Sequence, residues 1–264
     1  MKKNNKCIAS KFNNCEGPIS GEHYISRAIL EFLSNNNTAE IYGLPWIEPK
    51  KIKKIGINSL TSNILCSKHN SDLSDYDSEI LKLFKAFDEI DKHFNGSINL
   101  NINEVIIDGD KIEKWMLKAC VGMIASKQIS NNHQRQEIIN KDIYLDILFD
   151  NKIFPNNWGL YFKIPENKTI HKFNGYSFLP KTANNELKSV EFWINNFIFN
   201  FVLGEPDNQE EWGIYRINKI IFKNGNESKI IKFNWDDKKY NKYIELSRIK
   251  TSDKIPENWE KYLS

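Results

Sequence analysis

The sequence predicts an α+β fold with a small N-terminal unit, a helical middle and a β-rich C-terminal region. In the middle of the chain, apolar residues recur every three to four positions, as on the buried face of an amphipathic helix. After residue 150 they alternate instead, as in Phe197, Phe199 and Phe201, which indicates strands with one buried face. The 264 residues suffice for one large domain or two modest ones.

The N-terminal unit is expected to consist of short elements separated by turns. A turn over residues 17–21 leads into Glu22-His23. Residues 26–34 carry apolar side chains at helical spacing and predict a short helix that ends at a run of asparagines. Residues 39–58 contain glycine and prolines that limit them to short β-type pieces, and residues 60–65 lead into a cysteine.

The helical middle is predicted from three apolar stretches. Residues 66–94 carry an apolar stripe with acidic side chains on the other faces, and Ser74, a good N-cap residue, marks a restart within them. Further helices are expected over residues 110–127 and 138–149. Between the first two helices, residues 97–107 alternate like a strand.

The C-terminal region is expected to be mostly β. Its strand candidates are residues 158–164, 172–179, 190–202, 213–222 and 229–235. Asn224-Gly225 is typical of a hairpin turn. Asn95-Gly96 predicts the domain boundary, with one domain over residues 1–95 and a recognition or regulatory domain over 96–264. A boundary near residue 150, which groups the helices with the N-terminal unit, is the alternative.

Charge is unevenly distributed along the chain. The formal net charge is +3, but residues 1–70 hold ten lysines and arginines against five glutamates and no aspartate, a surplus of five positive charges. Such a segment favours a polyanionic partner, and solvated loop charge is the alternative. No apolar run approaches the roughly 18 residues of a membrane helix, and the basic N-terminus leads into no apolar segment. We therefore expect a cytoplasmic protein that does not contact a membrane.

Three of the four cysteines lie in the first quarter of the chain. Clustered cysteines near a histidine indicate a metal site, because cytosolic proteins rarely keep disulfides. Cys66 and His69 have the spacing that places two ligands on one helical turn, and Cys7 and Cys15 would complete a tetrahedral zinc site. The wide separation of Cys7 and Cys15 leaves ordinary thiols as the alternative. Cys120 falls in an apolar helical stretch and is expected in the core.

A longer pattern surrounds these ligands. Cys7 and Cys15 are followed by Glu22-His23-Tyr24-Ile25-Ser26 and then by Cys66-Ser67-Lys68-His69-Asn70. This order resembles a subgroup of the HNH endonucleases with the pattern Cys…Cys…Glu-His-x-x-Pro…Cys-x-x-Cys-Asn. Serine replaces the proline here and histidine replaces the last cysteine, and both changes are chemically tolerable because histidine also ligates zinc. The resemblance covers residues 7–70, about a quarter of the chain.

The resemblance implies an N-terminal treble-clef ββα-metal HNH unit in which the four ligands hold a structural Zn²⁺. His23 would be the general base that activates water, since an imidazole titrates near neutral pH. Glu22 and Asn70 would be the oxygen ligands of a catalytic Mg²⁺ or Mn²⁺. The central asparagine of the motif is either Asn58 or Asn63, and each is equally an ordinary turn residue.

We therefore expect a metal-dependent endonuclease that hydrolyses phosphodiester bonds, with DNA as the substrate by family resemblance. A defence or mobile-element effector, with a signal or protein partner acting through the C-terminal region, is compatible with this expectation. The alternative class is a zinc finger that binds nucleic acid or protein without cutting. Glu22, His23 and Asn70 together favour the enzyme, because a pure binding module has no need of all three.

Overall fold

We describe the protein from a computed structural model. The structure describes residues 6–23, 25–34, 38–41, 53–125, 130–131, 134–135, 141–163, 169–172, 176–183, 186–194, 197–236, 240–246 and 248–251. Helices and sheets both occur, and strands dominate the C-terminal region, so the predicted α+β class is confirmed.

The N-terminal elements are short, as predicted. They are a 3₁₀-helix η1 (Ser10–Phe12), β1 (Ile19–His23), α1 (Arg27–Leu33), β2 (Thr38–Ile41), β3 (Lys53–Gly56), β4 (Thr61–Cys66) and α2 (Ser67–Asp72). Strands β1 and β4 pair antiparallel, with Ile19 opposite Cys66 and His23 opposite Thr61. Strand β4 passes directly into α2, so the β1–β4 pair is followed by a helix, with α1, β2 and β3 between the two paired strands.

Three helices form the middle of the molecule. They are α3 (Ser74–Phe94), α4 (Gly109–Ala125) and α5 (Lys141–Phe149). The restart near Ser74 is confirmed, but Ser74 is the first helical residue; Leu73 precedes it without a side-chain capping bond. Cys120 is buried in α4, as expected. Among the helices that the structure describes, none combines the length and the apolar character that a membrane span requires.

The C-terminal strands form two main sheets. The five-stranded sheet has the order β10 (Tyr176–Ala183), β11 (Glu186–Ile194), β12 (Phe197–Val202), β8 (Gly159–Lys163) and β13 (Ile214–Tyr215). The four-stranded sheet has the order β16 (Tyr243–Leu246), β14 (Lys219–Asn224), β15 (Glu227–Asn234) and β5 (Glu104–Asp108). Smaller elements are β6 (Ser130–Asn131), β7 (Gln134–Arg135), β9 (Thr169–Lys172), β17 (Arg248–Thr251) and the 3₁₀-helix η3 (Gln209–Trp212).

Several predicted strands differ from the structure. The candidate over 213–222 is divided between β13 and β14, and the candidate over 172–179 covers the end of β9 and the start of β10; in both cases the two strands belong to different sheets. The candidate over 190–202 is two antiparallel strands, β11 and β12, each of which has its own alternating set of apolar residues. The candidate over 97–107 is a strand only from Glu104, where β15 begins to supply backbone partners, and Ile98 and Ile102 before it are exposed. The predicted hairpin turn at Asn224-Gly225 is confirmed between β14 and β15.

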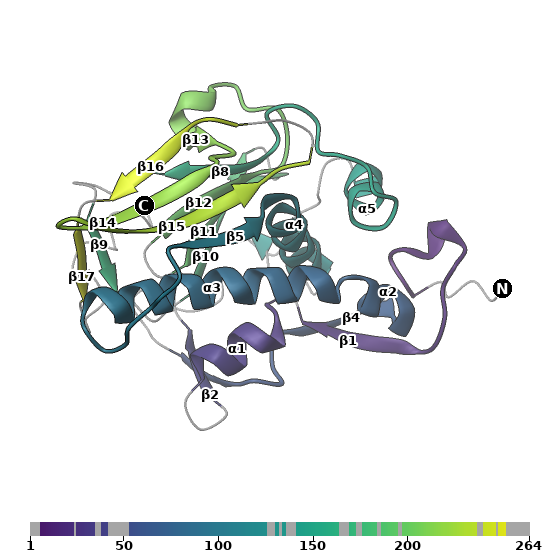
Figure 1. The fold of residues 1–264 in the computed structure, drawn as a ribbon. Coiled ribbons are helices and arrows are strands. Elements are labelled where there is room, and N and C mark those ends of the chain that lie inside the picture. Colours follow the sequence, from purple (N-terminus) through teal and green to yellow (C-terminus); the bar gives the residue numbers. More distant parts are fainter. Residues whose placement is uncertain are drawn as a thin grey trace.

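The long helix α3 lies at the centre of the fold. Figure 1 shows it between the N-terminal elements α1, β1 and β4 on one side and the large sheets on the other. Helix α4 packs against α3, β1 and β4, and it also contacts β12 and β15. Phe87 of α3 stacks on Phe197 of β12 with ring centroids 4.1 Å apart, so one hydrophobic core continues across residue 95. The division into domains at residues 95–96 stays a prediction.

Candidate metal centre

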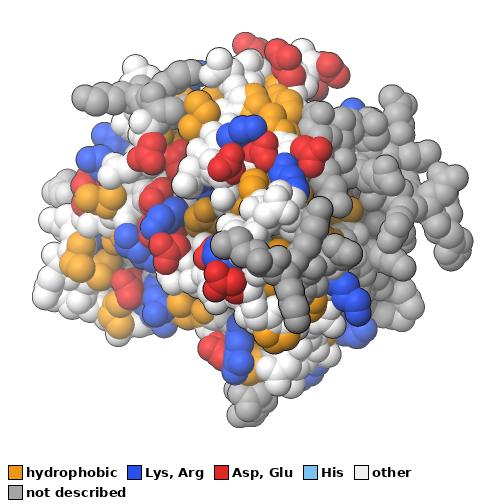
Figure 2. Space-filling model, turned by 90° about the vertical axis from the view of Figure 1, so that its right-hand side faces the viewer, with side chains coloured by type: hydrophobic (Ala, Val, Ile, Leu, Met, Phe, Trp, Pro, Cys, Tyr) orange, Lys and Arg blue, Asp and Glu red, His pale blue; other side chains and the backbone are white. Residues whose placement is uncertain are grey.

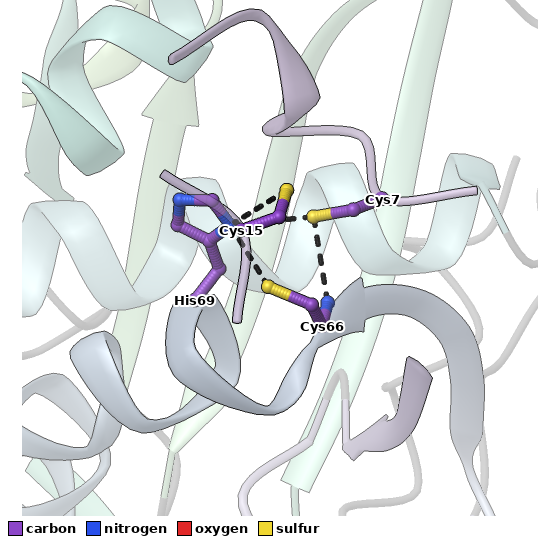
Figure 3. A group of neighbouring side chains, drawn as sticks. All are labelled: Cys7, Cys15, Cys66 and His69. Atoms are coloured by element: carbon purple, nitrogen blue, oxygen red, sulfur yellow. Dashed lines mark hydrogen bonds between the residues drawn. The ribbon is translucent and has the colours of Figure 1, made fainter. Parts of the chain in front are cut away.

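The four predicted metal ligands converge on one buried point. The sulfur atoms of Cys7, Cys15 and Cys66 and a ring nitrogen of His69 all lie within 4.8 Å of one another. Figure 3 shows the three sulfur atoms gathered around one edge of the imidazole. Within the described ranges, no other group of three or more such residues is close enough to hold a metal ion.

Local backbone contacts explain this convergence. Cys66 ends β4 and His69 lies in the first turn of α2, so the junction itself presents two ligands on one side. The N–H of Ile8 donates to the carbonyl of Ile64 at 2.8 Å, which lays the segment of Cys7 along β4. The Cys66 N–H also donates to Cys7 Sγ at 3.4 Å.

A tight turn brings Cys15 to the same place. The N–H groups of Ser67 and Lys68 donate to the carbonyls of Pro18 and Glu16, at 2.9 and 3.2 Å. Between these acceptors Gly17 has a φ of +74°, and a Cβ there would lie 3.0 Å from that of Ser67. The close approach of the turn to α2 therefore requires glycine.

The histidine offers its Nδ1 atom to the sulfur atoms. The Nδ1 of His69 lies 3.2 Å from Cys66 Sγ, 3.3 Å from Cys7 Sγ and 3.8 Å from Cys15 Sγ. Its Nε2 lies 2.7 Å from Asn14 Oδ1, which is only an acceptor, so Nε2 carries the proton and Nδ1 presents its lone pair. Hydrogen bonds of this kind orient histidine ligands in metal sites.

The acidity of the thiols also bears on what the group can hold. Burial raises the pKa of the Cys7 thiol to about 11, although the N–H groups of Cys66 and Ala9 oppose this. Burial also acts to raise the pKa of Cys66, but hydrogen bonds from the backbone N–H groups of His69 and Glu16, together with those from the Cys7 and Cys15 side chains, outweigh it and lower the pKa below its ordinary value. A metal ion would have to displace the remaining protons. Three sulfur donors and one imidazole suit a soft or borderline cation, so the group could hold a metal ion such as Zn²⁺.

Glu22 and His23 lie at the far end of β1 from the metal centre. Glu22 is buried, and its Oε1 lies 2.5 Å from Nζ of Lys118 in α4. Burial raises the pKa of Glu22 to about 7, and Lys118 limits this rise. The half-buried His23 donates from Nε2 to the carbonyl of Ile57 at 3.2 Å, which leaves its Nδ1 as the basic nitrogen.

The asparagines of the expected motif have separate positions. Asn70 is half-buried in α2, and within the described residues it makes no hydrogen bond to Glu22 or His23. Asn58 is exposed in the turn before β4, directly after Ile57, and Asn63 is exposed on β4. The contact that orients His23 therefore comes from a backbone carbonyl next to Asn58. The catalytic roles of Glu22, His23 and Asn70 stay predictions.

Four residues around Glu22 were not predicted to lie near it. Lys118 contacts Asp77 of α3 as well as Glu22, with Nζ 2.6 Å from Asp77 Oδ2. The other oxygen of Asp77 accepts a hydrogen bond from Ser26, and Ser26 Oγ in turn accepts from Trp115 Nε1 at 2.6 Å. These residues come from three distant segments, so no local spacing marks them.

Comparisons with known proteins identify no relatives of this chain. No family model matches the chain, and neither the curated proteins nor the solved structures contain a match. The geometry of the site and the sequence pattern therefore carry the functional argument.

Proposed function

We propose that the chain is an HNH-type metal-dependent endonuclease whose N-terminal unit is a treble clef stapled by one structural Zn²⁺. The observation that carries the proposal is the convergence of the four ligands at the junction of β4 and α2. These residues are Cys7, Cys15, Cys66 and His69. A buried group of three thiols and one imidazole matches the donors of structural zinc sites.

The proposed reaction is hydrolysis of a phosphodiester bond. His23 accepts a proton at Nδ1 from the attacking water, while the water oxygen bonds to phosphorus and the bond to the leaving oxygen breaks. Burial, together with the positive charges of Arg27 and Lys118, lowers the pKa of His23 below 6.5, so its imidazole is neutral at pH 7. Mg²⁺ or Mn²⁺ supplies charge stabilisation at the phosphate when bound, and Glu22 and Asn70 are the residues that would hold it.

The substrate is proposed to be DNA, on the resemblance of the motif alone. The surplus of positive charge in residues 1–70 supports a polyanionic substrate only in part. Lys11 pairs with Asp146, and Lys68 pairs with Asp72. Figure 2 shows acidic and basic side chains intermixed on one face of the molecule. We also propose a defence or mobile-element role, in which a signal acts on the C-terminal region.

Cleavage by the zinc-loaded full chain tests this proposal. Supercoiled plasmid, single-stranded DNA and RNA are incubated with the protein in Mg²⁺ or Mn²⁺, and we expect DNA to be cut. His23→Ala should lower the rate by about 10²–10⁴-fold with zinc content unchanged. His93→Ala is the matched control, because His93 contacts Glu227 outside the site. If neither DNA nor RNA is cut under any metal, the proposal fails.

One observation favours a second candidate function. The Glu22 side chain is only 4% exposed and is already paired with Lys118, as a structural carboxylate would be. This favours a zinc module that binds nucleic acid or protein without cutting it. In that case the wild-type protein and the His23→Ala variant retain nucleic acid equally in a binding assay, and neither cuts it.

A further inference from the structure

A buried lysine from the helical middle reaches into the N-terminal unit. The side chain of Lys118 in α4 is 3% exposed, and its Nζ lies 2.5 Å from Glu22 Oε1 and 2.6 Å from Asp77 Oδ2. One ammonium group therefore bridges a carboxylate of β1 and a carboxylate of α3. Glu22, one of the two carboxylates, directly precedes His23 in the sequence.

Burial of this lysine demands well-fixed partners. An ammonium group that leaves water costs several kcal/mol unless close anions and hydrogen bonds compensate it. Asp77 is itself fixed by Ser26, and Ser26 by the indole of Trp115. Lys118 therefore donates to a fixed carboxylate on α3 and forms an ion pair with Oε1 of Glu22.

We propose that Lys118 is a positioning residue, which holds the Glu22 carboxylate in the orientation that binds a hard divalent cation beside His23. The inference rests on the proposed function and goes beyond it, because the resemblance reaches only residue 70. Carboxylates that ligate metals are usually held by a second group through their other oxygen, and loss of such a group typically costs 10–100-fold in metal affinity or activity. Lys118 has the charge, the distance and the burial for this role.

The position of Lys118 depends on the C-terminal region. Helix α4 also carries Glu113, which is fully buried and bonds to Arg216 through both oxygens, at 3.0 and 2.7 Å. Glu113 Oε1 further accepts the N–H of Leu160 in β8 at 2.8 Å. The same helix is therefore fixed to the β-rich region at Glu113 and to the N-terminal unit at Lys118.

Binding of Mn²⁺ to the zinc-loaded full chain tests the inference without relying on cleavage. Free and bound Mn²⁺ are measured by electron paramagnetic resonance for wild type and for Glu22→Gln, Lys118→Met and Lys118→Arg. Lys229→Met is the matched control, because Lys229 is also buried and hydrogen-bonded, to Leu100 and Asn103. Thermal unfolding and zinc content are recorded for each variant.

The inference predicts that the wild-type protein binds Mn²⁺ and that Glu22→Gln abolishes this binding. Lys118→Met should weaken it about 10–100-fold, Lys118→Arg should restore part of it, and Lys229→Met should leave it unchanged even if stability falls. Equal Mn²⁺ affinity in Lys118→Met and wild type overturns the inference, as does a wild type that binds no Mn²⁺.

The cleavage assay separates the two proposals. A wild type that cuts DNA with the same metal dependence in Lys118→Met overturns the inference and leaves the proposed function intact. A wild type that binds Mn²⁺ through Glu22 and Lys118 but cuts nothing supports the inference and overturns the nuclease.

Discussion

At the scale of single residues, the metal centre depends on a side chain that is not a ligand. Asn14 holds the Nε2–H of His69, and this fixes the tautomer whose Nδ1 faces the three sulfur atoms. Without that acceptor, the ring loses its orientation and part of its basicity. The centre is therefore a set of four ligands and one amide.

Substitution of Asn14 tests this dependence. Asn14→Leu removes the acceptor and should weaken zinc binding about 10–100-fold, as is typical for such outer partners. Asn14→Asp keeps an acceptor oxygen and should retain most of the affinity. Competition with a chromophoric zinc chelator measures both. Equal zinc affinity in Asn14→Leu and wild type would show that the hydrogen bond is incidental.

Burial of Glu22 predicts a pH dependence of stability. Its pKa is raised from 4.5 to about 7, mainly by burial, so the folded state binds this proton more tightly than the unfolded state does. The contribution of protonated Glu22 to the free energy of unfolding is therefore fully present below pH 4.5 and is lost as the pH rises to about 7. Relative to Glu22→Gln, wild type should lose roughly 3 kcal/mol across that window. Denaturant unfolding at pH 5 and 8 measures the difference, and an identical pH profile for both proteins would contradict it.

The sequence identified the ligands but not the residues that support them. Cys66 and His69 are three residues apart across the junction of β4 and α2, so their spacing is visible in the sequence, and Cys7 and Cys15 are further cysteines in the same quarter of the chain. Asn14, Asp77 and Lys118 act through contacts between distant segments. Such contacts leave no period or spacing in a single sequence, which is why they could not be predicted.

At the scale of elements, the contact between the turn before β1 and the start of α2 positions the ligands of the metal centre. Gly17 has a positive φ, and its backbone approaches Ser67 so closely that a methyl group would lie 3.0 Å from that side chain. This contact keeps Cys15 next to Cys66 and His69. The turn therefore contributes to metal binding although it supplies no ligand.

Two glycine substitutions distinguish the effect of this contact on zinc binding from the effect of backbone strain on stability. Gly17→Ala should destabilise the protein by roughly 1–3 kcal/mol and should also weaken zinc retention. Gly96→Ala is the matched control, because Gly96 also has a positive φ, of +81°, but nothing lies within 4 Å of the added methyl group. It should cost about 1–2 kcal/mol and leave zinc affinity unchanged. If both variants retain zinc equally, the turn does not position Cys15.

Most helices and strands were predictable because they are amphipathic. The apolar stripes gave α3 and α4, and the alternation of Phe197, Phe199 and Phe201 gave β12, whose three phenylalanines are buried. Alternation alone could not show where a strand finds a partner. Residues 97–103 alternate too, but β15 begins to pair only at Glu104.

At the scale of the whole molecule, the N-terminal unit and the β-rich region share one core. Phe87 of α3 packs against Phe197 and Phe222, which belong to different C-terminal sheets. Helix α4 is bonded to both sides through Lys118 and Glu113. We therefore expect the described parts of the chain to unfold as one unit, with the boundary at residue 95 marking a turn.

Phe87→Ala tests this cooperativity. Removal of the ring should cost about 3–5 kcal/mol, as for large-to-small changes in cores. Zinc release reports the N-terminal unit, and tryptophan fluorescence is dominated by the C-terminal region, which holds five of the seven tryptophans: Trp158, Trp193, Trp212, Trp235 and Trp259. Both probes should shift together to lower denaturant concentration. Two separate transitions, with only one of them shifted, would instead support two independent domains.

X-ray absorption at the zinc edge, combined with metal analysis of the purified full chain, shows whether the four residues bind zinc. Binding at the centre formed by Cys7, Cys15, Cys66 and His69 predicts one zinc ion per chain, with three sulfur neighbours at about 2.3 Å and one nitrogen at about 2.0–2.1 Å. Cys66→Ser and His69→Ala should lose that ion. Protein that contains no zinc, or zinc that both variants retain with an oxygen-rich shell, would show that these four residues are not a zinc site.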